Sequence, residues 1–386
     1  MKILYYSWFE NTMQDMIDTF LTFGYEVVKC TIPCSNYETD QAFTNNLEKI
    51  LQENHYDFIF SFNFFPLIAR TAERFQIRYI SWIYDCPHGT LCSPAVKGTY
   101  NYIFVFDYVQ YSGLSSLNLP HLFHFPLAVH TTRLYEQWNK EDRYYQNKIS
   151  FVGSLYENNM YDQVLYLPDY LKGYLKGVMQ AQKKVYGYNF IEEVLDDPVV
   201  QDLKRYIRLD LDPSYYFDIR KIYADMINAK ITAEERTELL QRLSERYEVT
   251  LYTASALNKG FQNIKYGGII DYRMEMPRVF HQSEINLNIT LRSIQSGIPL
   301  RALDIMGAGG FLLSNYQKEL ADNFIDGKEL VLYGSEEELF YYADYYLEHK
   351  KEREEIAFHG FQKVRELFSY EVRVGKMMDI VKNSDL

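Results

Sequence analysis

The sequence lacks several features that would place it in a class at once. No apolar run approaches the roughly 18–20 residues that a membrane-spanning helix needs. The stretch from Met1 to Ser7 is too short for the apolar core of a signal peptide and is typical of a first β-strand. We therefore expect a soluble, cytoplasmic protein without a transmembrane segment.

Cysteine is scarce, with four residues in a chain of 386. Cys30 and Cys34 have the spacing C-x3-C, and Cys86 and Cys92 have C-x5-C; neither matches a common zinc signature. We expect reduced, incidental thiols and no metal site. A metal held by these cysteines together with His88 is the alternative.

Positive charge is also in deficit, because 40 Lys and Arg face 52 Asp and Glu, a net charge of −12. This balance disfavours nucleic acid or another polyanion as a partner. The most basic segment, residues 172–184, carries four lysines on a predicted helix. A solvated helix face is the preferred interpretation, and a peripheral membrane contact is the alternative.

The glycines of a dinucleotide-binding fingerprint are missing as well. The loop after the first predicted strand reads Trp8-Phe9-Glu10-Asn11 and contains no G-x-G-x-x-G. A dinucleotide-dependent dehydrogenase is therefore disfavoured.

What the sequence does contain is a repeated alternation of apolar strands and amphipathic helices. Because cores rarely grow beyond about 250–300 residues, this length predicts at least two domains. Near-continuous apolar strands indicate parallel sheets covered by helices on both faces. The predicted class is α/β, with an N-terminal domain over residues 1–145 and a C-terminal domain over 146–386. The boundary is placed at the polar stretch around residues 139–143.

In the N-terminal domain, strands are predicted at 3–6, 25–30, 57–61, 78–84, 102–106 and 121–125, with helices at 12–21, 41–54 and 66–75. Ligands of such sheets bind at the carboxyl ends of the strands. The loops at 7–11, 62–66 and 84–89 are therefore expected to face a ligand.

The C-terminal domain opens with a strand at 148–154, and an all-helical insertion is predicted over about 157–246. The sheet resumes at 247–252, 264–270 and 284–289, with a helix near 274–281. A strand at 329–332 follows later, and C-terminal helices occupy about 335–386.

The stretch from Ser296 to Gly310 is the clearest functional motif. It lies between two apolar runs and predicts a strand, a loop, a short helix beginning at Pro299, and a second strand. A helix N-terminus offers free N–H groups and a positive dipole to a phosphate. Asp304 lies one turn further in, where its carboxylate can accept hydrogen bonds from sugar hydroxyls. We expect this unit to hold a nucleotide-diphosphate sugar.

This stretch, with residues 315–320, Gly327-Lys328-Glu329 and the later Tyr346, Leu347 and His349, resembles the C-terminal module of CgeB-like, spore-maturation-type glycosyltransferases. Residues 79–87 and 124–129 resemble the companion N-terminal domain of that bacterial family. The resemblance implies a GT-B fold: two Rossmann-like domains facing a cleft.

The resemblance also implies roles for individual residues. Asp304 falls on the second acidic position of the E-x7-E pattern of retaining GT-B enzymes, which binds the ribose; Ser296 stands at the first. Gly153 and Ser154 occupy the place of a diphosphate contact. Such enzymes usually stabilise the diphosphate without a metal, so no cofactor is required beyond the donor, a UDP-sugar. The acceptor, a glycan, a protein or a small molecule, is expected at the N-terminal domain.

The residues themselves suggest further contacts. The backbone N–H groups of Gly297, Ile298 and Leu300, around Pro299, are expected to cradle the diphosphate, with Arg301 as a charge-assisted partner. An ion pair between Arg301 and Asp304 is the alternative. A tight turn would equally explain Gly153.

The remaining candidates are aromatic or titratable. Tyr252 and Tyr272 are expected to flank the base. Asp85, His88 and, more weakly, Glu10 are candidates for the general base of an inverting reaction. A helix N-cap for Asp85 and a solvent-exposed His88 are the alternatives.

These observations predict a metal-independent glycosyltransferase of the hexosyl type. A sugar-nucleotide epimerase on the same scaffold, and a non-catalytic nucleotide-binding or assembly protein, are the alternatives.

Overall fold

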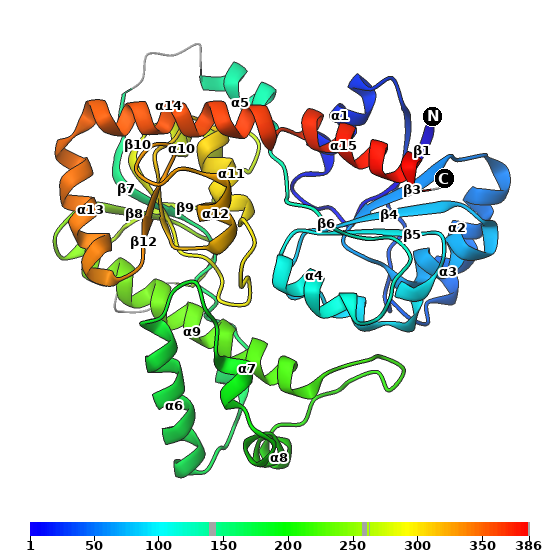
Figure 1. Cartoon of the computed structure of the whole chain (residues 1–386), viewed down its shortest axis with the longest axis horizontal. Coiled ribbons are helices and arrows are strands. Elements are labelled where there is room, and N and C mark those ends of the chain that lie inside the picture. Colours follow the sequence, from blue (N-terminus) through cyan, green and yellow to red (C-terminus); the bar gives the residue numbers. More distant parts are fainter. Residues whose placement is uncertain (139–143, 257–260, 262, 385–386) are drawn as a thin grey trace. The chain divides into compact units, whose positions relative to one another are not determined.

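The computed structural model describes residues 1–138, 144–256, 261 and 263–384. Contacts divide the chain into two compact units. The first comprises Met1–Ala128, Leu211–Phe217 and Ser369–Leu386, and the second comprises Val129–Asp210 and Asp218–Phe368. Each unit contains one six-stranded parallel sheet (Figure 1). The predicted α/β class is confirmed.

The first unit has the strand order β2-β1-β3-β4-β5-β6. Its strands are β1 (Lys2–Tyr6), β2 (Glu26–Cys30), β3 (Phe58–Phe62), β4 (Arg78–Ile83), β5 (Asn101–Val105) and β6 (Leu122–His124). Its helices are α1 (Met13–Thr22), α2 (Gln41–Glu53), α3 (Pro66–Phe75), α4 (Tyr108–Ser115) and α15 (Tyr370–Asn383), with short 3-10 turns η1 (Gly89–Cys92) and η2 (Pro94–Lys97). The predicted strands and helices of this region are confirmed to within a few residues.

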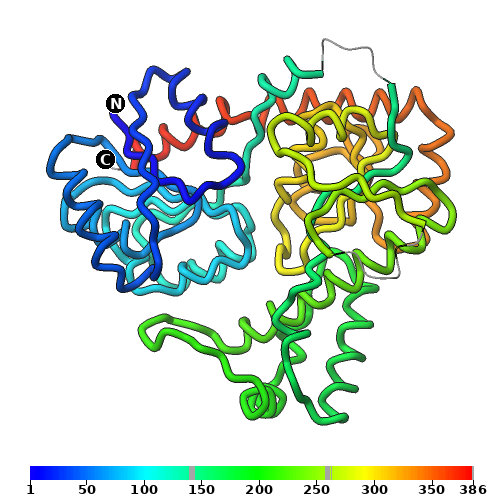
Figure 2. The backbone as a smooth tube through the Cα atoms, turned by 180° about the vertical axis from the view of Figure 1, so that it is seen from behind, coloured from blue at the N-terminus to red at the C-terminus, as the bar shows by residue number. Residues whose placement is uncertain are grey.

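Alternation along β1 explains why both faces of this sheet are covered. Tyr5 packs on Phe60, which in turn contacts Phe20 of α1. Tyr6, one residue on, points to the opposite face and contacts Phe43 of α2. Successive side chains of a strand alternate between faces, so an apolar strand requires helices on both. The first strand, β1, and the last helix, α15, both lie in this unit (Figure 2).

The second unit has the order β12-β11-β10-β7-β8-β9. Its strands are β7 (Asn147–Val152), β8 (Val249–Tyr252), β9 (Lys265–Gly268), β10 (Ser283–Asn288), β11 (Leu312–Asn315) and β12 (Val331–Tyr333). Outside the insertion its helices are α5 (Thr131–Trp138), α10 (Met276–His281), α11 (Leu300–Gly307), α12 (Lys318–Asn323), α13 (Glu336–Glu348) and α14 (Lys350–Leu367).

The core of the second unit also depends on two helical layers. Leu240 of α9 and Leu339 of α13 share a buried cluster with Phe151 of β7 and Leu287 of β10. On α14, a Cβ at Gly360 would lie 3.4 Å from the Met306 side chain of α11 and closer still to a backbone carbonyl. Glycine at this position therefore lets α14 approach the rest of the unit.

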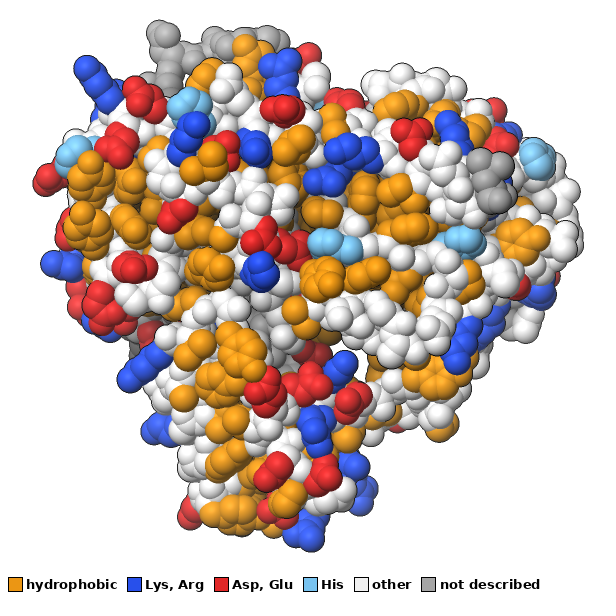
Figure 3. Space-filling model, viewed as in Figure 1, with side chains coloured by type: hydrophobic (Ala, Val, Ile, Leu, Met, Phe, Trp, Pro, Cys, Tyr) orange, Lys and Arg blue, Asp and Glu red, His pale blue; other side chains and the backbone are white. Residues whose placement is uncertain are grey.

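The predicted helical insertion is confirmed, because no strand occurs between β7 and β8 in this fully described segment. It contains η3 (Tyr161–Gln163), α6 (Asp169–Lys183), α7 (Ile191–Val194), α8 (Asp197–Tyr206) and α9 (Ile219–Ser244). Helix α6 buries Leu171 and Leu175 and exposes Lys172 and Lys176, as expected of a solvated face. Hydrophobic side chains also reach the surface of the insertion (Figure 3). Tyr170 of α6 is exposed.

The compact units differ from the predicted domains in three places. Helix α5 precedes the predicted boundary but belongs to the second unit, where Trp138 stacks on His281 at 4.7 Å. Helix α15, predicted with the C-terminal domain, returns to the first unit, where Tyr370 contacts Trp82. Residues 211–217 of the insertion also join the first unit, and the Tyr216 N–H donates to the Cys92 carbonyl at 2.8 Å.

Helices α5 and α15 are assigned to their units by packing of aromatic side chains, and residues 211–217 by a backbone hydrogen bond. A polar stretch of sequence indicates neither kind of contact. The predicted boundary at 139–143 itself lies outside the described residues. Among the described residues, no helix is both long and apolar enough to cross a membrane.

Candidate functional site

The motif from Ser296 to Gly310 forms the predicted strand–loop–helix–strand unit, with α11 between β10 and β11. Pro299 is the N-cap of α11 rather than its first helical residue, with φ −66° and ψ 139°. Gly309 ends the helix with φ +67°, and a Cβ at Gly310 would meet the Phe280 carbonyl oxygen at 2.8 Å. The glycines therefore serve the helix stop and close packing.

The structure brings three predicted site residues together at α11, two from this helix and Tyr272 from the turn before α10. The Tyr272 hydroxyl donates to Asp304 Oδ1 at 2.9 Å, and Arg301 Nη1 lies 3.1 Å from Asp304 Oδ2. Asp304 is 5% exposed, and the Arg301 guanidinium also packs 5.5 Å from the Phe280 ring centroid. The ion pair proposed as an alternative for Arg301 is thus formed. Tyr272 contacts the acidic residue expected to bind ribose.

Ser296 is held by a carboxylate from another element. Its Oγ donates to Glu319 Oε1 at 2.9 Å, and the Glu319 N–H donates to the Ser296 carbonyl at 3.0 Å. Glu319 is buried in the first turn of α12. Gly297, Ile298 and Pro299 are also buried, while Leu300 is partly exposed. The loop before α11 is therefore fixed rather than loose.

Gly153 and Ser154 form the turn after β7. The Gly153 N–H donates to the Tyr252 carbonyl at 3.1 Å, and Ser154 Oγ accepts from the Tyr156 N–H at 3.0 Å. A Cβ at Gly153 would make only ordinary contacts, the nearest at 3.5 Å. Arg236 of α9 donates to the Ser154 carbonyl at 2.6 Å.

Arg236 was missed by the sequence analysis. It is 8% exposed and also donates through Nε to the Ile289 carbonyl at 3.0 Å, so it ties the loop after β7 to the loop after β10. Burial lowers the pKa of its guanidinium. The sequence signal that could have pointed to Arg236 is an arginine within the apolar pattern of a buried helix.

Tyr252 packs on Gly267, where a Cβ would collide with its ring at 2.3 Å.

In the first unit, Asp85 and His88 follow β4, at the predicted ligand-facing edge. Asp85 is exposed, and its Oδ2 accepts from Asn63 Nδ2 at 2.7 Å. Asn63 adopts a positive φ of 62°, and its Oδ1 accepts from the Tyr84 N–H at 2.9 Å. The loops after β3 and β4 are thereby joined, and the carboxylate of Asp85 stays open to solvent.

His88 is anchored instead to the loop after β3. Its Nε2 lies 3.2 Å from the Phe64 N–H nitrogen and 2.7 Å from Thr90 Oγ1. Burial lowers the pKa of the imidazole, which favours the neutral ring. Nε2 also lies 3.2 Å from the Phe64 carbonyl oxygen, so it contacts the Phe64 backbone in either tautomer. The solvent-exposed alternative for His88 is wrong, because the side chain is only partly exposed and its Nε2 faces the backbone.

Glu10 is 4% exposed and closes the loop after β1. Its carboxylate accepts from the Tyr5 hydroxyl, from Ser7 Oγ at 3.1 Å and from the Trp8 N–H at 3.1 Å. Burial raises its pKa. The indole of Trp8 donates to the Phe62 carbonyl at 3.1 Å, which links this loop to the one after β3.

Among the described residues, the cysteine side chains form neither a disulfide bond nor a metal site. Cys30, Cys34, Cys86 and Cys92 form no disulfide bond, and burial raises the pKa of Cys30 and brings that of Cys34 to about 11. The described part of the chain brings no three His, Cys, Asp or Glu side chains close enough to hold a metal ion.

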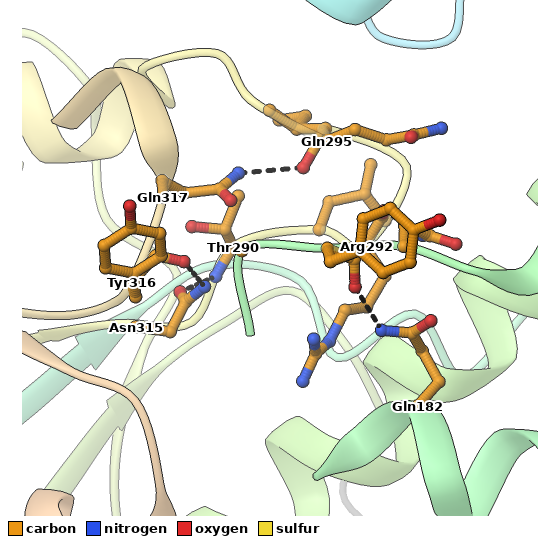
Figure 4. A pocket seen from close by; sticks show the side chains of 12 residues that line it. Gln182, Thr290, Arg292, Gln295, Asn315, Tyr316 and Gln317 are labelled. Atoms are coloured by element: carbon orange, nitrogen blue, oxygen red, sulfur yellow. Dashed lines mark hydrogen bonds between the residues drawn. The ribbon is translucent and has the colours of Figure 1, made fainter. Parts of the chain in front are cut away.

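A pocket that the sequence analysis did not predict lies at the carboxyl ends of β10 and β11 (Figure 4). The insertion, the loop after β10 and the end of β11 line it. The lining residues are Gln182, Gly187, Tyr188, Asn189, Thr290, Leu291, Arg292, Ile294, Gln295, Asn315, Tyr316 and Gln317. Carboxyl ends of parallel strands are the usual ligand-binding edge.

Residues 235–379, which include α11, match a family model described as "Glycosyl transferase-like". None of the curated protein sequences matches the chain. The family match supports a glycosyltransferase group 1-like relationship for this part of the chain.

Three solved structures share the fold along nearly the whole chain. A sucrose-phosphate synthase from Thermosynechococcus elongatus has a TM-score of 0.57 at 9% identity, covering 99% of this chain and 98% of that one. A UDP-forming α,α-trehalose-phosphate synthase from Burkholderia xenovorans has a TM-score of 0.55 at 13% identity, covering 100% and 99%. An α-glucosyltransferase in complex with UDP and a 13-mer DNA has a TM-score of 0.53 at 10% identity, covering 99% of both chains. The chain has the GT-B fold.

Proposed function

We propose that this protein is a metal-independent glycosyltransferase of the CgeB-like type, which transfers a hexose from a UDP-sugar to an acceptor. The observation that carries the proposal is the contact of Tyr272 and Arg301 with Asp304 of α11, inside the segment that matches the glycosyltransferase model. Two of the structural relatives are a UDP-forming enzyme and a UDP complex, which supports UDP as the nucleotide.

In this proposal, the second unit binds the donor. Asp304 is the partner of the ribose hydroxyls, and Tyr272, which already touches it, lies next to the base. The N-terminal end of α11 and the fixed loop from Ser296 to Leu300 stabilise the negative charge of the departing diphosphate. Electrostatic stabilisation of a leaving group is often the largest single contribution to catalysis.

The first unit binds the acceptor in this proposal, and Asp85 is the best candidate for a general base. Of the three candidates it alone is exposed, while Glu10 is buried in hydrogen bonds to its own loop and His88 is anchored to the Phe64 backbone. A base must reach the acceptor hydroxyl, and an exposed carboxylate meets that condition.

The test compares Asp304→Ala with Asp322→Ala, an exposed aspartate on α12 that pairs with Lys318. Losing hydrogen bonds to two ribose hydroxyls should weaken UDP binding by roughly 10- to 100-fold in calorimetry. Asp322→Ala should bind UDP like the unaltered protein. UDP affinity unchanged by Asp304→Ala would contradict the assigned site.

Measuring the hydrolysis and the transfer of UDP-sugars then distinguishes an effect on binding from an effect on turnover. Asp85→Ala should bind UDP normally and lose turnover by about 10²- to 10⁴-fold, the range of general base catalysis. Wild-type turnover would exclude Asp85 as the base. UDP binding without turnover on any donor or acceptor would instead indicate a binding protein.

A further inference from the structure

The loop after β1 carries two aromatic side chains that reach solvent at the carboxyl-end edge of the first sheet. Phe9 is 74% exposed, more than any other large hydrophobic side chain in the described part of the first unit, and Trp8 is 38% exposed. Carboxyl ends of parallel strands form the edge where such sheets bind ligands. Because burial of an aromatic ring is favourable, a ligand that covers these rings gains free energy that folding has not used.

Hydrogen bonds inside the protein hold this loop in one arrangement. The buried carboxylate of Glu10 accepts from the Trp8 N–H at 3.1 Å, and Ser7 Oγ accepts from the Phe9 N–H at 3.0 Å. The indole N–H of Trp8 donates to the Phe62 carbonyl at 3.1 Å. A loop that is already ordered loses little conformational entropy when a ligand binds.

The backbone of Phe9 lies in a region that disfavours residues with a Cβ. Its φ is +68°, in the left-handed region that glycine adopts freely. The ring makes one close polar contact, with Lys29 Nζ of β2 at 5.8 Å from the ring centroid. A strained backbone that presents an exposed ring at a ligand-facing edge indicates a binding role for that ring.

The aromatic groups continue across the sheet to the loop after β4. The rings of Trp8 and Tyr84 meet nearly edge to face, with centroids 6.5 Å apart and planes at 78°. Tyr84 also contacts the buried ring of Phe62 at 5.7 Å. From Phe9 beside β2 to Tyr84 after β4, these rings extend over four neighbouring strands, or about 14 Å. Asp85, the next residue, adds an exposed carboxylate.

This combination of groups indicates the class of ligand. Aromatic rings pack against C–H faces, and a carboxylate accepts hydrogen bonds from hydroxyl groups. A sugar offers both, because its ring has C–H groups on its faces and hydroxyl groups at its rim. A phosphate would be repelled by Asp85, and an acyl chain would desolvate the ionised carboxylate without pairing it.

We propose that Trp8, Phe9 and Tyr84 form an aromatic platform that stacks on a carbohydrate acceptor, whose hydroxyl group faces Asp85. The inference rests on the proposed function and names the class of its acceptor. In the transfer, the acceptor hydroxyl gives its proton to Asp85 and its oxygen bonds to the anomeric carbon. The bond from that carbon to UDP breaks, UDP leaves with the electron pair, and Asp85 returns the proton to solvent.

The experiment first probes a glycan array with the protein in saturating UDP. It then measures UDP release from UDP-glucose, UDP-galactose and UDP-N-acetylglucosamine with each glycan that binds. A serine- and threonine-rich peptide and vesicles containing diacylglycerol are tested in parallel as other acceptors. At least one glycan should bind and should release UDP faster than hydrolysis does without an acceptor.

Variants of Phe9 separate the platform from the fold. Phe9→Gly removes the ring and relieves the backbone strain, so its melting temperature should be no lower than that of the unaltered protein. Its KM for the glycan should rise about three- to tenfold, the scale of one aromatic contact, while kcat and UDP affinity stay within about twofold. Phe9→Tyr keeps a ring and should keep the KM. Phe358→Ala, which removes an exposed ring of α14, is the control and should behave like the unaltered protein.

The outcomes distinguish this inference from the proposed function. A glycan KM that Phe9→Gly leaves unchanged would overturn the platform. Transfer to the peptide or to diacylglycerol alone, or UDP binding by a protein that binds no glycan, would overturn the carbohydrate class. The proposed function would stand in each of these cases. Failure of the unaltered protein to bind UDP or any UDP-sugar would overturn both.

Discussion

The loops at the carboxyl ends of the two sheets use their polar groups in opposite ways. In the first unit, Glu10, Asp85 and His88 hydrogen-bond within or between the loops that carry them. In the second unit, Arg292 and Glu235 neutralise each other, and the residues that line the neighbouring pocket are mainly neutral amides and phenols. A titratable residue at a ligand-facing edge is therefore not by itself a catalytic group.

This difference bears on where the chemistry is expected. Two of the three acid–base candidates of the first unit are used to shape loops, which leaves Asp85 as the exposed one. The second unit keeps Asp304 and Arg301 in a pair at α11. In the proposed function, the second unit binds the donor and stabilises the leaving group, and Asp85 of the first unit supplies the acid–base chemistry.

The largest expected effect comes from breaking the buried pair of the second unit. Glu235→Ala leaves Arg292 charged and unpaired, which should lower the free energy of unfolding by about 3–5 kcal/mol. Glu234→Ala is the matched control, since this neighbouring carboxylate is more exposed and pairs with Lys183 at 3.2 Å. It should cost no more than about 1 kcal/mol. Equal urea midpoints for the two variants would contradict a stabilising role for the Arg292–Glu235 ion pair.

A second effect depends on pH. Burial first, and then Glu192, raises the pKa of Asp225 on α9 to about 7, although a hydrogen bond from Ser293 and the nearby Lys221 oppose the shift. Between about pH 4 and pH 7 the folded chain holds a proton that the unfolded chain has released, so this group costs stability as the pH rises.

Asp225→Asn removes this cost while keeping a hydrogen-bond acceptor for Ser293. The variant should gain stability over the unaltered protein by up to about 4 kcal/mol at pH 8 and by little at pH 4. Melting temperatures at pH 4, 6 and 8 measure the difference. Asp202→Asn on α8, which pairs with Arg205, is the control and should show no such trend. A gain that is the same at all three pH values would refute the assignment.

The smallest effect tests the loops of the first unit. Glu10→Ala leaves the buried Tyr5 hydroxyl without its acceptor, which should cost about 1–3 kcal/mol. Adding Tyr5→Phe removes both partners and should restore part of that loss. If the double variant is as unstable as the sum of the two single variants, the hydrogen bond is not what holds the loop.

Much of the fold could be predicted because it rests on local patterns. Strand β3 is a short, fully buried run, Pro66 begins α3, and Gly309 follows the end of α11. The spacing of apolar residues, together with proline and glycine, therefore predicted these elements to within a few residues. The pairing of Arg301 with Asp304 was also foreseeable, since residues three apart share a helix face.

Contacts between distant segments were not foreseeable in this way. Ser296 meets Glu319, Arg292 meets Glu235, and α15 returns to the first unit, all across many residues of chain. No period or spacing marks such partners, because they are selected by burial and charge compensation after the sheets have assembled. The sequence by itself determined the elements and the α/β class, and it predicted an anion-binding role for α11. The tertiary structure decided which polar groups are neutralised and which remain open to a ligand, because only packing brings a charge to its counter-charge.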